Sequence, residues 1–237
     1  MDSGKFHCGI LAGSQNFSPE GIMKKILHRL FITMSLLVML SAEPALAHPH
    51  SFISMKTQII AGQGQITALQ MRWMMDEITS ADLLYDAGEA KPDSPVWKRL
   101  AAEVMANVLT QHYFTEFWHN GEKVKFAARP SAYSLSREGH QAVLEFTLPL
   151  ARPQPLAGQR YLFSTFDPSY FVDMSYENDN EVLLPDELKG ACKVAVKTPK
   201  PDAAVQAFAL SLDKADAPPE GMALGKQFAQ QVTLQCQ

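Results

Sequence analysis

The chain has 237 residues and a net charge of −4, and 46% of its residues are hydrophobic and 19% are charged. This is the balance of an ordinary globular protein that is long enough for a real core. It gives no sign of the strongly basic surface that nucleic-acid binding requires, so we expect no nucleic acid among its partners.

The first predicted element is a secretory leader. Basic side chains between residues 24 and 29 precede an apolar stretch over residues 30–40, and Ala45-Leu46-Ala47 fits a signal-peptidase site. The apolar stretch is too short to span a bilayer comfortably. The pattern therefore predicts cleavage after Ala47 and delivery to the periplasm.

This leader sets the expected domain organisation. Residues 1–47 form the leader, and residues 48–237 form one periplasmic domain without a membrane span. The first 22 residues carry no structural pattern, and Met23 directly precedes the basic residues. Met23 is therefore a candidate start in place of Met1.

A hairpin is predicted directly after the cleavage site. Apolar residues alternate over 48–60 and again over 66–75, and Gly62-Gln63-Gly64 supplies the turn between them. Methionines that alternate with Leu69 and Trp73 indicate core residues rather than copper(I) ligands. Because the strands are antiparallel, the end of the second strand should lie beside the start of the first.

The rest of the chain predicts an α+β fold of mainly antiparallel, sandwich-like sheets. Ser94-Pro95 opens one longer helix at about 95–112, and Thr79 or Ser80 is expected to cap a short helix that ends at Tyr85. The proline-rich stretch 149–158 is expected to be a link, and 203–210 a short helix. The further strands are predicted at 114–118, 124–127, 131–136, 142–148, 161–166, 170–176 and 192–196, and residues 228–234 are either a strand or a helical turn.

Two cysteines follow the leader. Cys192 and Cys236 form an even pair in an oxidising compartment, so a disulfide between them is expected. A two-cysteine metal site is the alternative, but the chain has neither the CxxC spacing nor a neighbouring histidine that usually accompanies one.

The residues behind the cleavage site predict a metal centre. Cleavage after Ala47 would leave His48 with a free α-amine beside its imidazole, and His50 follows two residues later on the same face of the strand. Such nitrogens bind late first-row divalent metals. Pro49 has no amide N–H, which excludes the amino-terminal copper and nickel motif that uses deprotonated backbone amides.

Carboxylates are expected to complete this centre. The hairpin register brings Asp76 and Glu77, at the end of the second strand, close to the two histidines. The alternative is that this acidic pair caps the following helix. Asp167 and Asp173 flank aromatic residues at a bend between strands and are further candidates, with a structural role in the turn as their alternative.

Enzyme signatures are missing from the sequence. It contains no GxSxG, no HExxH, no phosphate-binding glycine loop and no dinucleotide fingerprint. We therefore expect a protein that is not an enzyme.

Four motifs together resemble one bacterial periplasmic family of unknown function. They are His48-Pro49-His50 after the leader, Trp73-x-x-Asp76-Glu77, Thr147-Leu148-Pro149-Leu150, and Asp167-Pro168-x-Tyr170-x-Val172-Asp173. The family is often described as the periplasmic component of an uncharacterised ABC-type transport system. Its members commonly lie beside nickel/cobalt-type permeases, and some are implicated in zinc acquisition. The resemblance covers essentially all of residues 48–196 and implies a periplasmic metal-handling accessory protein.

The expected function is therefore binding of a divalent transition metal in partnership with an inner-membrane metal permease. Zinc is the first expectation for the metal, and nickel or cobalt follows. One alternative is a copper histidine-brace carrier or oxidase, in which the terminal amine and the imidazoles of His48 and His50 hold the copper. The other is a metal-free periplasmic interaction module.

Overall fold

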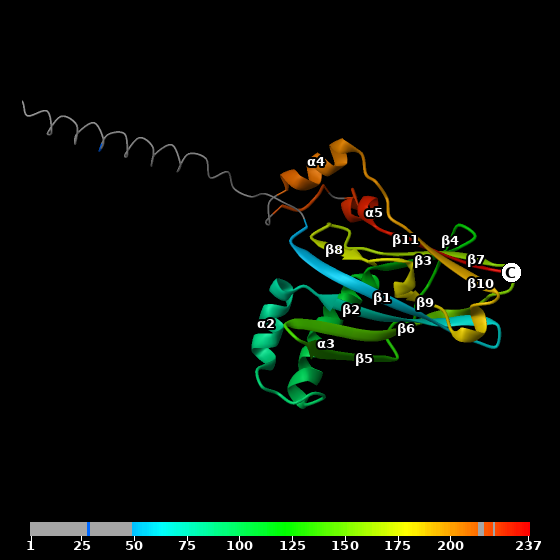
Figure 1. Ribbon diagram of the computed structural model, residues 1–237, viewed down its shortest axis with the longest axis horizontal. Coiled ribbons are helices and arrows are strands. Elements are labelled where there is room, and N and C mark those ends of the chain that lie inside the picture. Colours follow the sequence, from blue (N-terminus) through cyan, green and yellow to red (C-terminus); the bar gives the residue numbers. More distant parts are fainter. Residues whose placement is uncertain (1–27, 29–48, 213–215, 220) are drawn as a thin grey trace, which may run out of the picture. The chain divides into compact units, whose positions relative to one another are not determined.

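The computed structural model describes residues 28, 49–212, 216–219 and 221–237 (Figure 1). Contacts within the chain group it into residues 1–45 and 46–237, and almost all described residues belong to the second unit. Apart from residue 28, the predicted leader lies outside the described residues. The same holds for its cleavage site after Ala47 and for His48, the first of the two predicted histidine ligands. None of the described helices is both long and apolar enough to cross a membrane.

A six-stranded sheet carries the start of the domain. Its strand order is β5-β6-β2-β1-β8, and β9 pairs with β1 beyond β8. The predicted hairpin is confirmed, because β1 and β2 pair antiparallel with Ile53 opposite Met75. β8 and β9 pair with β1 in the parallel direction. The strands are β1 (Ser51–Gly62), β2 (Gln65–Met75), β5 (Ala132–Glu138), β6 (Gln141–Pro155), β8 (Val172–Ser175) and β9 (Val182–Leu183).

A five-stranded antiparallel sheet forms the second layer. Its order is β10-β11-β7-β3-β4. The expected disulfide is present between Cys192 and Cys236, which lie opposite each other on β10 and β11. The strands are β3 (Thr115–His119), β4 (Glu122–Val124), β7 (Arg160–Thr165), β10 (Cys192–Lys197) and β11 (Gln231–Cys236).

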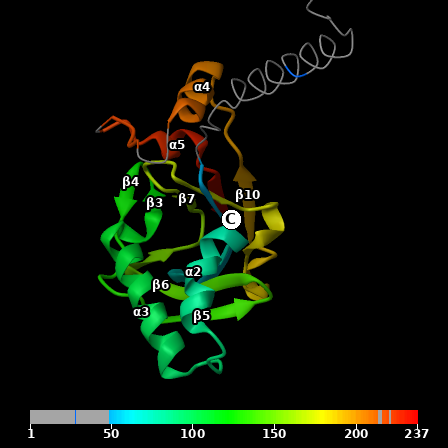
Figure 2. The same cartoon turned by 90° about the vertical axis from the view of Figure 1, so that its left-hand side faces the viewer.

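Helices α2 and α3 lie together against the β5–β6 side of the six-stranded sheet (Figure 2). α2 packs on β6 and α3 on β5, and α4 and α5 lie at the other end of the molecule, near β8 in Figure 1. The longer helix predicted at about 95–112 is α3. The helices are α2 (Glu77–Ala87), α3 (Pro95–Thr110), α4 (Ala203–Ser211) and α5 (Leu224–Phe228), together with the short 3₁₀ turns η1 (His112–Phe114), η2 (Asp179–Glu181) and η3 (Asp186–Leu188). The α+β prediction with mainly antiparallel sheets is thus confirmed.

The core follows the alternation in the sequence. The odd-numbered residues of β1 from 51 to 59 are buried, and the even-numbered residues from 52 to 56 are exposed. Trp73 is 1% exposed and meets Phe146 edge to face at 4.9 Å between ring centroids. Met55, Met71 and Met75 are buried in the same cluster, which confirms that these methionines are core residues.

Two local predictions were wrong. The short helix begins at Glu77, and its N-cap is Asp76 rather than Thr79 or Ser80. The stretch 149–158 was predicted to be a link, but β6 continues through it as far as Pro155. The strand can hold prolines here because its pairing with β2 shifts register in this part. At the end of β3, His119 stacks on Tyr161 at 4.5 Å and hydrogen-bonds the Gln159 side chain at 2.8 Å.

Candidate metal centre

His50 lies at the point where the chain enters the six-stranded sheet. Its backbone N–H donates to the carbonyl oxygen of Phe171 at 2.9 Å, which continues the parallel pairing of β1 with β8 by one residue. The imidazole is half-buried, and its centroid lies 5.1 Å from that of the Phe171 ring. The backbone hydrogen bond and the ring contact together fix the position of this histidine at the start of β1.

Asp173 lies on the same face of the sheet as His50. It pairs with Phe52, which is two residues beyond His50 on β1, and residues two apart on a strand share a face. Its side chain is half-buried, and burial raises the pKa of its carboxyl group. Among the described residues, no hydrogen bond or ion pair to this carboxylate is present.

Tyr170 and Phe228 form the wall beside Asp173. Their rings stack at 3.9 Å between centroids, which places α5 against the bend before β8. Burial, and then the charge of Asp173, raise the pKa of Tyr170 to about 12. The phenol is therefore neutral at physiological pH and adds no charge to this wall.

Asp76 lies at the end of β2, as the hairpin predicted, and its carboxylate accepts hydrogen bonds from backbone N–H groups of two elements, β1 and α2. Its Oδ1 accepts the Thr79 N–H at 2.8 Å, and its Oδ2 accepts the Phe52 N–H at 2.7 Å and the Thr79 hydroxyl at 2.7 Å. Burial alone would raise the pKa of Asp76, but these hydrogen bonds lower it overall. The alternative interpretation, that Asp76 caps the following helix, is therefore confirmed. Glu77 is exposed in the first turn of that helix.

Asp167 holds the bend before β8 together. Its carboxylate accepts the Ser169 N–H at 3.0 Å, the Ser169 hydroxyl at 2.8 Å and the Val172 N–H at 3.1 Å. Gly225 packs on the same bend so closely that a Cβ there would lie 1.8 Å from the Asp167 carbonyl oxygen. Asp167 as a whole residue is only 9% exposed. Its carboxylate stabilises the turn, which is the structural role given above as the alternative to metal binding.

The candidate residues therefore divide into two groups. Asp76 and Asp167 are committed to backbone hydrogen bonds, whereas His50 and Asp173 share a sheet face at one end of β1. Within the described part of the chain, no group of three or more His, Cys, Asp and Glu residues is placed to hold a metal ion. His48, the remaining predicted ligand, lies outside that part.

Sequence reasoning missed the pairing that places Asp173 here. The parallel contact between β1 and β8 joins residues about 120 positions apart, and strand pattern alone carries no signal for such a partner. It also missed Ser51 and Thr79, whose hydroxyls lie 2.6 Å apart and join β1 to α2. The aromatic residues around Asp173, which the sequence motif already contained, were the one available signal.

The family comparison covers this whole arrangement. Residues 33–236 match the family described as "Protein of unknown function (DUF1007)". The chain belongs to the DUF1007 family.

A relative that matches over most of its own length and most of this chain supports this membership. The chain is 35% identical over 193 residues to an uncharacterized protein of Haemophilus influenzae, with 81% of this chain and 92% of the relative covered. No solved structure matches the chain. The DUF1007 match includes His48, His50, Asp76 and Asp173, so the candidate centre lies inside the shared region.

Proposed function

We propose that this protein binds a divalent transition metal at the start of β1 and works in the periplasm with an inner-membrane metal permease. The proposed ligands are the α-amine and imidazole of His48, the imidazole of His50 and the carboxylate of Asp173. The observation that carries the proposal is the placement of Asp173, a half-buried carboxylate on the sheet face of His50.

The environment of Asp173 supports a ligand role. Burying a carboxylate costs free energy unless a partner compensates it, and its raised pKa is the sign of that cost. A bound cation is such a partner, because it favours the ionised form. Asp76 and Asp167 differ, since backbone and hydroxyl donors already satisfy them.

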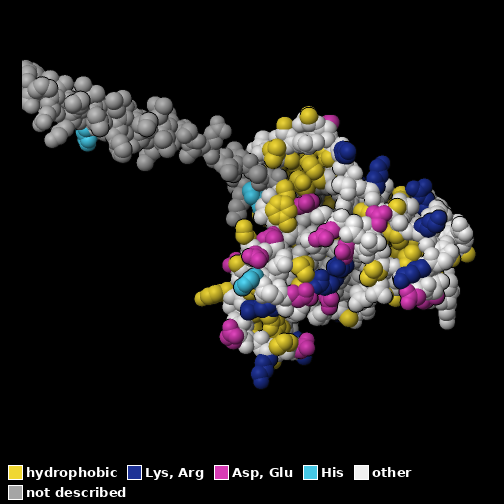
Figure 3. Space-filling model, viewed as in Figure 1, with side chains coloured by type: hydrophobic (Ala, Val, Ile, Leu, Met, Phe, Trp, Pro, Cys, Tyr) yellow, Lys and Arg dark blue, Asp and Glu magenta, His cyan; other side chains and the backbone are white. Residues whose placement is uncertain are grey.

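The ligand chemistry favours zinc. Two imidazoles, an amine and a carboxylate form the N and O donor set that zinc accepts in four-coordinate sites, and nickel or cobalt accepts similar donors. Protons compete for these nitrogens, so affinity should fall below about pH 6, where histidine protonates. Figure 3 shows Asp and Glu side chains, with Lys and Arg side chains among them, over the part of the surface formed by α2 and the start of β1. The acidic side chains attract a cation.

The free terminus is the feature that an experiment can test directly. Zinc is titrated calorimetrically into the chain that begins at His48 and into the same chain with one glycine added before His48. The added residue removes the α-amine from the imidazole while leaving every described residue unchanged. We expect the extension to weaken zinc binding strongly, and equal affinities would remove the amine from the site. Tighter binding of Cu(II), with three nitrogen ligands in its spectrum, would favour the copper histidine brace instead.

A second candidate function is a metal-free interaction module. Ile78 and Tyr85 lie seven residues apart on α2 and are 85% and 87% exposed. Phe52 at the start of β1, whose N–H binds the helix cap Asp76, is 51% exposed. Large apolar side chains held this far into solvent are common at protein contacts. This candidate predicts that the purified mature chain contains no metal and shows no calorimetric signal with zinc, nickel or cobalt.

A further inference from the structure

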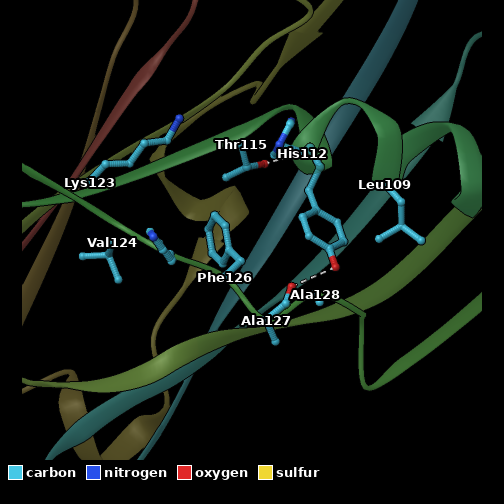
Figure 4. Close-up of a pocket in the computed structure, with 10 residues that line it drawn as sticks. Leu109, His112, Thr115, Lys123, Val124, Phe126, Ala127 and Ala128 are labelled. Carbon is cyan, nitrogen blue, oxygen red and sulfur yellow. Dashed lines mark hydrogen bonds between the residues drawn. The ribbon is translucent and has the colours of Figure 1, made fainter.

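A cleft lies where the chain passes from the five-stranded sheet to the six-stranded sheet. After β4, Phe126 forms a bridge with Leu150 of β6, and the Ala127 N–H donates to the Pro149 carbonyl at 2.8 Å. The end of α3 and the turn η1 form the opposite wall (Figure 4). The cleft volume is about 460 Å³, which is within the range of small-molecule sites.

The walls of this cleft are mainly apolar. The Tyr113 hydroxyl donates to the Ala127 carbonyl at 3.1 Å and so ties the two walls together at one end. The Tyr113 ring also meets the Phe126 ring edge to face at 6.2 Å. The apolar lining consists of Leu109, Tyr113, Val124, Phe126, Ala127 and Ala128.

One wall has a strained backbone. His112, Tyr113 and Phe114 have φ angles of 51°, 61° and 51°, which lie in the left-handed region that favours glycine. Each such residue costs roughly one to two kilocalories per mole of conformational energy, and strain of this kind is often found at ligand sites. Here the strained turn brings both His112 and Tyr113 to the cleft.

The rim of the cleft is cationic in a chain of net negative charge. This charge comes from Lys123 and Lys125, which lie on one side of the cleft. Lys123 pairs with Glu116 at 3.1 Å. Lys125 is exposed, and no ion pair involves it in the part of the chain that the structure describes. An apolar floor below a cationic rim matches a ligand with an apolar body and an anionic head.

We propose that this cleft binds an anionic amphiphile, with its acyl chain against Leu109, Val124 and Phe126 and its carboxylate or phosphate head at Lys125. Dispersion and the hydrophobic effect hold the chain, and the ammonium group holds the head. A neutral head would lose the ionic contact, and a cationic head would be repelled. The proposal shares no residue with the metal centre, so either can fail without the other.

The test is calorimetric titration of the mature chain with four twelve-carbon probes below their micelle concentrations. Dodecanoate and dodecyl phosphate carry anionic heads and separate the two sources of the head group. Dodecyl maltoside is the neutral probe, and dodecyltrimethylammonium is the cationic probe. We expect saturable binding of at least one anionic probe, and binding of the neutral and cationic probes weaker by roughly tenfold or more.

Two pairs of variants locate the binding. Lys125→Glu should weaken the anionic probe by about tenfold, while Lys193→Glu, the same change on β10 at the opposite edge of the sheet, should not. Ala128→Trp should fill the cleft and abolish binding. Ala195→Trp, the same change at an exposed position of β10, should leave binding unchanged. All four positions are exposed, so circular dichroism and thermal unfolding should match the wild type.

The outcomes decide the proposal. Saturable binding that is weakened in Lys125→Glu, lost in Ala128→Trp and unchanged in the two control variants would support it. Equal affinity for all four heads would overturn the role of Lys125, and binding that survives Ala128→Trp, or no binding of either anionic probe, would overturn the site.

Discussion

Replacing Asp76 by alanine should destabilise the domain without removing any of the proposed metal ligands. Asp76 caps α2 through the Thr79 N–H and also accepts the Phe52 N–H at the start of β1. Loss of the cap costs about 1 kcal/mol. Loss of the charged hydrogen bond to Phe52 costs about 1–2 kcal/mol more, since that bond is accessible to solvent.

The combined loss of unfolding free energy is therefore about 2–3 kcal/mol, or roughly 5–10 °C in the melting temperature of a domain this size. Urea denaturation and a thermal melt measure both quantities. Asp82→Ala is the matched control, because Asp82 is exposed on the same helix and should change stability by no more than about 0.5 kcal/mol.

The effect should also depend on pH. Hydrogen bonds hold the folded pKa of Asp76 below its ordinary value of 3.8. The stabilisation from the carboxylate is thus present above that ordinary value and is lost as the pH falls through the lower folded pKa. Wild type and Asp76→Ala should therefore converge in acid. A constant difference in unfolding free energy down to pH 2, or an unchanged melting temperature at pH 7, would refute the assigned role.

Three further predictions concern other parts of the structure. Replacing Cys192 and Cys236 together by alanine should lower the unfolding free energy by about 4 kcal/mol, since the bridge closes a loop of 44 residues; a loss below 1 kcal/mol by urea denaturation would contradict this. Gly225→Ala should cost about 3 kcal/mol by the same assay, because the new methyl group would meet the Asp167 carbonyl oxygen, whereas Gly190→Ala has open space and serves as the control. Asp173→Asn should raise the melting temperature of the metal-free chain at pH 7, because burial of the ionised carboxylate costs stability there. The gain should vanish below pH 3.8, the ordinary pKa of the group, where Asp173 is protonated in the unfolded chain as well. Asp86→Asn, at an exposed position, is the control, and a lower melting temperature of Asp173→Asn at pH 7 would contradict the prediction.

Local pattern was enough to predict most elements and the β1–β2 hairpin. Alternating residues on both strands and a glycine-rich turn left one register that buries Ile53, Met55 and Trp73 together. The placement of Asp76 beside the start of β1 followed from that register. The sequence placed two boundaries wrongly, the end of β6 at Pro155 and the start of α2 after Asp76. Pairing with a neighbouring strand sets the first boundary, and a helix cap sets the second.

The rest of the candidate site depends on contacts between distant segments. The pairing of Phe52 with Asp173 is parallel and non-local, so no turn chemistry or spacing in the sequence signals it. The left-handed turn at His112–Phe114 was equally hidden, because none of its three residues is a glycine that would announce a positive φ. Here the packing of Tyr113 and Phe114 into the core overrides the local preference of the backbone.

The metal centre is tested most directly by zinc titration of the mature chain that begins at His48, compared with His50→Ala, Asp173→Asn and Asp76→Asn. The proposal predicts one zinc ion per wild-type chain. It also predicts affinity at least tenfold weaker in His50→Ala and Asp173→Asn, each of which removes a ligand, and little changed in Asp76→Asn. Equal affinity in all four proteins, or no zinc binding by the wild type, would contradict the metal centre at the start of β1.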